Sequence, residues 1–155
     1  MGSLLLSWLI GAQPVAAERP KPAYPQMRDR SKYGRMGDPA LDAHIRRYAN
    51  RRSVRRRLVL HSWRMLGANY RDDALGEGQG ASLDSEPRWR LAAVDCQTFV
   101  ETDLALSLGG DLAEARRWLD RIRYRGDAVG YAQRNHFMVG QWVPHLQRLG
   151  ILREA

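Results

Sequence analysis

The chain of 155 residues contains a single cysteine, Cys96, and this restricts the ways in which its fold can be held together. One cysteine cannot form an intrachain disulfide or a four-cysteine metal cage. The thiol is then either a small buried apolar residue or a reactive nucleophile. With 44% hydrophobic residues, the sequence predicts at most one globular domain.

The residues around the cysteine predict a helix over 95–108. Val100, Leu104 and Leu108 are spaced to share one helix face, and two glycines at 109 and 110 end the pattern. Cys96 then falls in the first turn, where unpaired N–H groups and the positive end of the helix dipole stabilise a thiolate. This position favours the nucleophile, and the inert thiol stays the alternative.

A cysteine nucleophile needs a general base within hydrogen-bond reach. Among the four histidines, His136 is the candidate, since it lies 40 residues after Cys96, far enough for another element to carry it back to the thiol. His61 has helical spacing with Met65, which predicts a packed or capping histidine, and His44 is expected at the surface.

Four segments of the chain resemble a family of bacterial cell-wall hydrolases. They are Asp-Cys-Gln-Thr-Phe-Val-Glu-Thr at 95–102, Arg-Ile-Arg-Tyr-Arg-Gly at 121–126, Arg-Asn-His-Phe at 134–137 and Gln-Trp-Val-Pro at 141–144. The family is the N-acetylmuramoyl-L-alanine amidase-like family, also called domain of unknown function 1460, within the papain-like NlpC-type superfamily. The segment 66–70 is similar to that superfamily's Gly-x-x-Tyr turn. The resemblance covers about 58–152.

The resemblance implies an α+β fold, the papain-like NlpC-type cysteine hydrolase fold, present here mainly as its helical half. It implies hydrolysis of the N-acetylmuramoyl-L-alanine amide of peptidoglycan, with Cys96 as nucleophile and His136 as base, and no cofactor. Tyr70 and Asp95 are implied as substrate-binding residues, although Asp95 is also placed to be a helix N-cap. No set of His, Cys and carboxylates here has metal-ligand spacing.

Other functions use the same residues. The superfamily also includes endopeptidases that cleave between D-glutamate and the diamino acid of the stem peptide, and papain-like proteases that act on proteins. A non-catalytic cell-wall binding module is a further alternative. The group that orients the imidazole is open between Asn135, His145 and a residue outside this chain, and Glu101 is expected either to pair with Arg134 or another cation or to be a surface charge.

The N-terminal residues predict export. Residues 1–17 have a short apolar stretch and a small-residue cleavage site, which are typical of a signal peptide. This stretch is shorter than the ~20 residues that span a bilayer, so no stable membrane anchor is expected after cleavage, and the protein is expected to be periplasmic or secreted.

Residues 18–37 predict a tether rich in proline and basic residues. Residues 38–155 predict the hydrolase domain, incomplete at its C-terminus because 138–155 does not contain the strands of an antiparallel sheet.

A net charge of +8 and an arginine-rich region at 46–64 suggest an anionic neighbour. The region predicts two helices, beginning near Asp38 and Ser53, whose arginines form either a solvated face or a site for an acidic polymer. Nucleic acid is excluded as a partner by the export signal and the lack of a recognisable motif. The expected partners are peptidoglycan or muropeptides.

The remaining segments complete the expected fold. The loop at 70–89 is expected to form a wall of the substrate groove. Two later helices are predicted at 111–122 and 138–149, the last kinked by Pro144.

Overall fold

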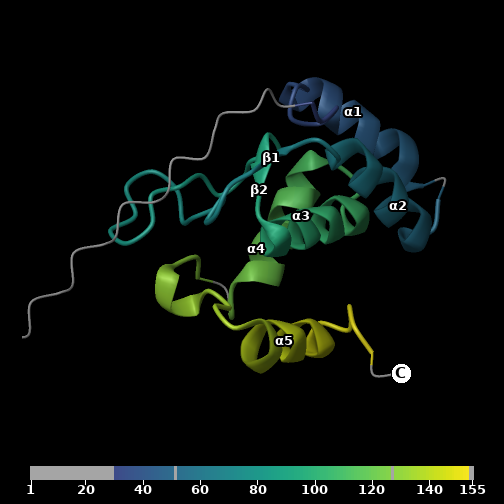
Figure 1. The fold of residues 1–155 in the computed structure, drawn as a ribbon. Helices are drawn as coiled ribbons and strands as arrows, with labels where there is room; N and C mark the ends of the chain where they lie inside the picture. The colour runs from purple at the N-terminus through teal and green to yellow at the C-terminus, as the bar shows by residue number, and fades with distance from the viewer. Residues whose placement is uncertain (1–29, 51, 127, 154–155) are drawn as a thin grey trace, which may run out of the picture.

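The structure is a computed structural model that describes residues 30–50, 52–126 and 128–153. The predicted signal peptide, 1–17, and residues 18–29 of the predicted tether lie outside the described residues. Helices make up most of the described chain (Figure 1). They are α1 (Asp38–Ala49), α2 (Val54–Met65), α3 (Cys96–Leu108), α4 (Leu112–Arg123), the 3-10 turn η1 (Tyr131–Gln133), the π-helical turn η2 (Met138–Trp142) and α5 (Val143–Arg148).

The sheet is small and parallel. Strands β1 (Asn69–Tyr70) and β2 (Ala93–Val94) pair so that Asn69 lies opposite Ala93 and Tyr70 opposite Val94. An isolated antiparallel bridge joins Tyr124 and Arg134. A helical structure with a small sheet agrees with the expected α+β class. The two strands of the described sheet are parallel, and the connection of 22 residues between them, 71–92, is long enough for a parallel crossover. The antiparallel sheet that the resemblance implies stays a prediction.

Helix α3 lies at the centre of the molecule, with α2 against one side and α4 against another (Figure 1). The sequence pattern predicted an apolar stripe through Val100, and this detail is wrong: Val100 is 43% exposed. Because neighbours surround the helix on several sides, most of its length is buried regardless of periodicity. Its buried residues are Thr98, Glu101, Thr102, Asp103, Ala105, Leu106 and Ser107.

Helix α4 follows its predicted pattern closely. Asp111 caps it by accepting a hydrogen bond from the N–H of Glu114 at 2.8 Å. Its four predicted core residues, at intervals of three or four positions, are all buried: Leu112, Ala115, Leu119 and Ile122. Leu119 and Ile122 pack with Trp142 and Leu146, and so join α4 to the C-terminal helix.

The described end of the predicted tether, 30–37, is a folded turn. Tyr33 is fully buried, and its hydroxyl lies 2.6 Å from Nδ1 of His61 on α2. The N–H of Arg30 donates to the carbonyl of Gly67, whose φ of 88° ends α2 in a conformation that favours glycine. The folded region therefore begins before Asp38.

Two histidines and a carboxyl lie in the interior near this turn. The predicted packing of His61 is confirmed, but His44 is half-buried rather than at the surface, with its ring 5.5 Å from that of Tyr33. Burial lowers the pKa of His44 and of His61 to about 4. Asp103 on α3 is 8% exposed, and burial raises its pKa to about 7.

The predicted helix over 138–149 is present but divided. Residues Met138–Trp142 form a π-helical turn, in which the N–H of Trp142 donates to the carbonyl of Phe137. Pro144 then occupies the first turn of α5. A proline lacks an N–H and is tolerated in the first turn of a helix, so a change of helix type replaces the expected kink.

Candidate active site

The chain enters α3 directly from β2, with Asp95 as the residue between them. The Asp95 carboxylate accepts a hydrogen bond from the N–H of Thr98 at 2.8 Å, and the Thr98 hydroxyl accepts one from the N–H of Asp95 at 2.9 Å. This reciprocal arrangement is a capping box. The N-cap interpretation of Asp95 is therefore confirmed.

Cys96 is the first residue of α3, and its side chain is exposed. The expectation of a buried thiol, the alternative to a nucleophile, is wrong as to burial, and the reactivity of Cys96 stays a prediction. The first N–H groups of a helix have no partner within it, so an exposed thiol here lies at a favourable position for negative charge.

Tyr70 lies beside this helix start because β1 pairs with β2. The N–H of Arg71 donates to the carbonyl of Val94, two residues before Cys96. The side chain of Tyr70 is 56% exposed and hydrogen-bonds to Asp72. That bond and the charge of Asp72, with smaller effects of burial, Cys96 and Asp95, raise the pKa of Tyr70 to about 12, so its hydroxyl remains a proton donor.

His136 is exposed and follows the turn η1. Its Nε2 lies 2.7 Å from the carbonyl oxygen of Tyr131, and the two rings are 4.4 Å apart. A carbonyl can only accept, so Nε2 carries the proton and Nδ1 of the neutral ring is the acceptor. The backbone N–H of His136 donates to Oε1 of Gln141 at 2.8 Å, which fixes the segment before η2.

A pocket of about 120 Å³ joins the start of α3 to the histidine segment. Asp95 and Gln97, on either side of Cys96, both line it, as does His136. Cys96 is not among its lining residues, and in the described part of the chain no hydrogen bond joins Cys96 to His136. The lining residues are Asp73, Leu75, Asp95, Gln97, Thr98, Glu101, Arg123, Arg134, Asn135 and His136.

A buried ion pair forms the floor of this pocket. Nη1 of Arg123 on α4 lies 3.0 Å from Oε2 of Glu101 on α3, and both residues are at most 3% exposed. The expectation that Glu101 pairs with a cation is confirmed, with Arg123 as the partner rather than Arg134. Burial raises the pKa of Glu101, and the charge of Arg123 opposes that rise.

The two residues of this pair also contact Gln97 in the first turn of α3 and two further segments. Nη2 of Arg123 donates to the carbonyl of Leu75 at 3.0 Å, and Nε2 of Gln97 donates to Oε1 of Glu101 at 2.9 Å. The N–H of Asn135, next to His136, donates to the carbonyl of Arg123 at 2.9 Å. The side chains of the ion pair thus fix the start of α3 and the loop after β1 relative to each other, and the backbone carbonyl of Arg123 holds the histidine segment beside them.

The loop of residues 71–92 is held by Arg134. Its Nε donates to Oε1 of Glu77 at 2.7 Å and its Nη2 to Oδ2 of Asp84 at 2.7 Å. Gly76 packs so closely that a Cβ there would lie 2.4 Å from Oδ1 of Asp84. Asp73 and Leu75 of this loop line the pocket, as the predicted groove wall requires.

Neither of the two residues considered as the orienting group contacts the imidazole of His136 in the described structure. The side-chain N–H of Asn135 donates to the carbonyl of Ile122 at 3.3 Å. Nε2 of His145 lies 2.7 Å from the carbonyl of Arg121, on the side of α4 that faces α5. The hydrogen-bond partner of the imidazole ring is the backbone carbonyl of Tyr131.

Sequence reasoning missed Gln97, Arg123 and Gln141 as residues of the site. A usable signal existed for Gln97, because Gln97 and Glu101 are polar residues four apart in the helix, a spacing that places them on one face. Arg123 and Gln141 lie within segments that carried the family resemblance, but nothing in their spacing distinguishes them from surface residues.

Within the described residues, no group of three or more His, Cys, Asp or Glu side chains is arranged to hold a metal ion. In the same ranges, no helix has both the length and the apolar character needed to cross a membrane.

Comparison with known proteins identifies the family. The profile of the N-acetylmuramoyl-L-alanine amidase-like family matches residues 61–154, which is more than half of the chain. The chain therefore belongs to this family. No curated protein matches the chain.

A solved structure agrees with this assignment. It is the crystal structure of a protein from Legionella pneumophila strain Philadelphia 1 that is described as a member of the DUF1460 family. The two chains are 31% identical and superpose with a TM-score of 0.63 over 72% of this chain. The match covers 40% of the Legionella protein, so this chain spans less than half of its length.

Proposed function

We propose that this chain carries the Cys–His centre of an exported peptidoglycan amidase that hydrolyses the amide between N-acetylmuramic acid and L-alanine. The observation that carries the proposal is the exposed Cys96 at the capped start of α3, flanked by two residues that share a pocket with His136. Family membership supports the reaction class. A papain-like NlpC-type fold and a periplasmic or secreted location belong to the same proposal.

In the first step, Nδ1 of His136 takes the thiol proton and the Cys96 sulfur attacks the lactyl carbonyl carbon of the muramic acid. The carbonyl π-electrons move to oxygen, where the backbone N–H of Cys96 stabilises the oxyanion. The Tyr70 hydroxyl is the second donor in this proposal, and it turns from Asp72 to the oxyanion when substrate is bound. The oxyanion collapses, the C–N bond breaks and the imidazolium protonates the leaving amine of L-alanine. Water, deprotonated by His136, then hydrolyses the thioester and releases the muramic acid carboxylate and the thiol.

The carbonyl of Tyr131 is the orienting group in this proposal. It accepts from Nε2–H, so the neutral ring presents Nδ1 to the thiol, and it stabilises the imidazolium that forms during the reaction. The bond from Cys96 to His136 forms when substrate binds, since catalytic hydrogen bonds often tighten only in the substrate complex.

Substrate binding uses the polar groups at the pocket rim. Asp95 has one carboxylate oxygen committed to the cap at 2.8 Å, whereas the other has only a long contact of 3.4 Å to the N–H of Ala74. That second oxygen can accept an N–H of the stem peptide. No step of this mechanism uses a metal or another cofactor.

The test is a muropeptide digest analysed by mass spectrometry. Wild-type protein is expected to release a stem peptide that begins with L-alanine, and Cys96→Ala and His136→Ala are expected to lose this activity. Phe137→Ala is the matched control, because Phe137 is the exposed neighbour of His136 and is expected to leave the activity within a few-fold of wild type.

Each result of the digest separates the alternatives. Cleavage after D-glutamate would keep the mechanism and make the protein an endopeptidase. Wall binding without cleavage, unchanged in Cys96→Ala, would make it a binding module. Alkylation by iodoacetamide at neutral pH gives an independent result: Cys96 is expected to react faster than free cysteine and more slowly in His136→Ala. Equal rates in all three samples would contradict a Cys–His pair.

A further inference from the structure

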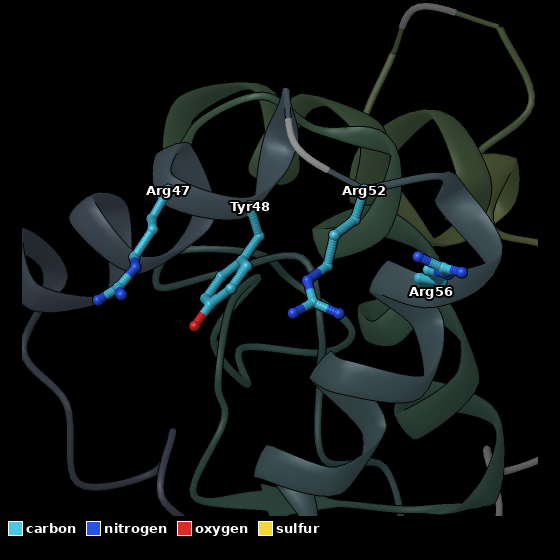
Figure 2. Close-up of a pocket in the computed structure, with 4 residues that line it drawn as sticks. All are labelled: Arg47, Tyr48, Arg52 and Arg56. Atoms are coloured by element: carbon cyan, nitrogen blue, oxygen red, sulfur yellow. The ribbon is translucent and has the colours of Figure 1, made fainter.

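A second pocket lies where the end of α1 meets the beginning of α2. It has a volume of about 380 Å³ and is lined by Arg47, Tyr48, Arg52 and Arg56. Figure 2 shows the side chains of Arg47, Tyr48 and Arg52 side by side, with Arg56 on the neighbouring helix. None of these residues lines the pocket beside Cys96.

The three arginines of this pocket have no carboxylate partner among the described residues. Eight other described arginines do have one, such as Arg46 with Asp42 and Arg116 with Asp38. Arg47 and Arg52 instead lie 5.7 and 5.4 Å from the ring centre of Tyr48, and the first turn of α2 contains no acidic residue. Three unneutralised guanidiniums around one hollow are suited to a phosphate group, which arginine binds with paired N–H donors.

The same face of α2 continues into an apolar row. Arg56, Val59 and Trp63 follow within α2 at intervals of three and four, which places them along one side of the helix, and Arg52 and Leu66 lie just outside its two ends. These three apolar side chains are 57%, 70% and 56% exposed. The opposite side of α2 carries the buried His61 and Met65.

A phosphate pocket that continues into exposed apolar side chains fits the surface of an anionic phospholipid bilayer. Arginines bind the phosphates, and Val59, Trp63 and Leu66 enter the region between headgroups and acyl chains, where tryptophan is favoured. A soluble anionic polymer would use the arginines but not the apolar row. The net charge of +8 adds long-range attraction to an anionic surface.

We propose that this face of α2, with the pocket of Arg47, Tyr48, Arg52 and Arg56, binds anionic phospholipid membranes peripherally. The proposal is independent of the amidase reaction, because none of its residues lies in the pocket next to Cys96.

The test is cosedimentation of the 155-residue chain with vesicles of phosphatidylcholine, with and without phosphatidylglycerol. Strong binding is expected only with phosphatidylglycerol. Arg52→Gln combined with Arg56→Gln is expected to weaken it about 30-fold, from roughly fivefold per arginine near an anionic surface. Arg117→Gln combined with Arg148→Gln removes the same charge from exposed positions elsewhere and is expected to weaken it less than fivefold.

The apolar row is tested separately with Trp63→Ser, which is expected to weaken vesicle binding about tenfold or more. Leu83→Ser is its control, since Leu83 is 69% exposed on the loop of residues 71–92. Every variant retains the same apolar residues at 4–10, so differences between variants report on α2.

Three results would overturn the proposal. Equal binding to phosphatidylcholine alone would remove the role of the phosphate pocket. An equal loss of vesicle binding in the Arg52→Gln, Arg56→Gln variant and in the Arg117→Gln, Arg148→Gln control would show that only the total charge matters. Binding to a soluble glycerol-phosphate polymer as strong as binding to vesicles, and unchanged in Trp63→Ser, would show that the pocket binds phosphate polymers without a bilayer.

Discussion

Arginines serve different roles in two regions of this molecule. Beside Cys96, Arg123 and Arg134 are neutralised by carboxylates and hold segments together from within. At the junction of α1 and α2, Arg47, Arg52 and Arg56 have no carboxylate partner in the described chain and surround an open pocket. The difference teaches that the positions of the carboxylates, rather than the number of arginines, separate a structural region from a binding surface.

The largest effect is expected in the region beside Cys96, for the variant Arg123→Met. It is expected to lower the free energy of unfolding by roughly 3–5 kcal/mol, because Glu101 would be left as an uncompensated buried charge. Urea unfolding at pH 7 measures the change. Arg117→Met is the control, since Arg117 pairs with Glu114 at the surface, and it is expected to cost less than about 1 kcal/mol.

A double variant, Arg123→Met with Glu101→Leu, sharpens this result. It is expected to regain most of the lost stability, because no buried charge then lacks a partner. A single variant as stable as wild type would break the comparison, since the buried arginines would then be as dispensable as the exposed ones.

Asp103 provides the reverse case, a buried carboxyl without an arginine partner among the described residues. Its pKa is raised from 3.8 to about 7, so between these pH values the unfolded chain releases a proton that the folded chain keeps. Stability from this group is therefore present at low pH and lost as the pH rises to about 7. Asp103→Asn is expected to match wild type near pH 4 and to exceed it at pH 8 by up to about 4 kcal/mol.

Urea unfolding of Asp103→Asn and of wild type, measured at several pH values from 4 to 8, checks this expectation. The quantity to compare is the difference between the two midpoints at each pH. The difference is needed because the lowered pKa values of His44 and His61 remove stability as the pH falls below about 6.5. A difference that is constant with pH would mean that Asp103 is ionised in the folded protein.

Arg134→Gln is expected to cost about 2 kcal/mol, since its hydrogen bonds to Glu77 and Asp84 would be lost in a partly buried place. The loop of residues 71–92 should then be cleaved faster by a protease of broad specificity. Arg125→Gln is the neighbouring control, because Arg125 is exposed and donates only to a backbone carbonyl. Unchanged cleavage in Arg134→Gln would show that other contacts hold the loop.

The smallest effect on stability is expected at the pocket between α1 and α2. Arg52→Gln with Arg56→Gln should change the free energy of unfolding by less than about 0.5 kcal/mol, because exposed charges without a carboxylate partner contribute little to stability. Thermal unfolding measures it. A loss above about 2 kcal/mol would show that these arginines hold the fold together, and the contrast between the two regions would fail.

Local signals in the sequence predicted much of this fold. Helix α4 has a simple apolar pattern and an aspartate cap, and both appear as expected. Tyr33 could not be predicted as buried, because its segment is otherwise polar and its partner His61 lies 28 residues away. The pattern in α3 misled for a physical reason: a helix surrounded by neighbours buries polar as well as apolar residues, and Glu101 finds its partner Arg123 on another helix.

The candidate site was predictable to a similar degree. The position of Cys96 in the first turn of a helix and the capping role of Asp95 follow from sequence rules. The pairing of Glu101 with Arg123 depends on how two helices approach each other, which spacing does not show. The carbonyl that contacts His136 is invisible in any sequence, because every residue carries one.

The parallel pairing of β1 and β2 has a consequence for how this loop tolerates inserted residues. Two backbone pairs place Tyr70 beside the start of α3, and Arg134 fixes the loop at Glu77 and Asp84. The loop tip at 79–83 lies beyond these attachments. Residues inserted there would add little closure entropy, which grows only with the logarithm of loop length. The tip can therefore be lengthened or exchanged while Tyr70 and Cys96 keep their alignment.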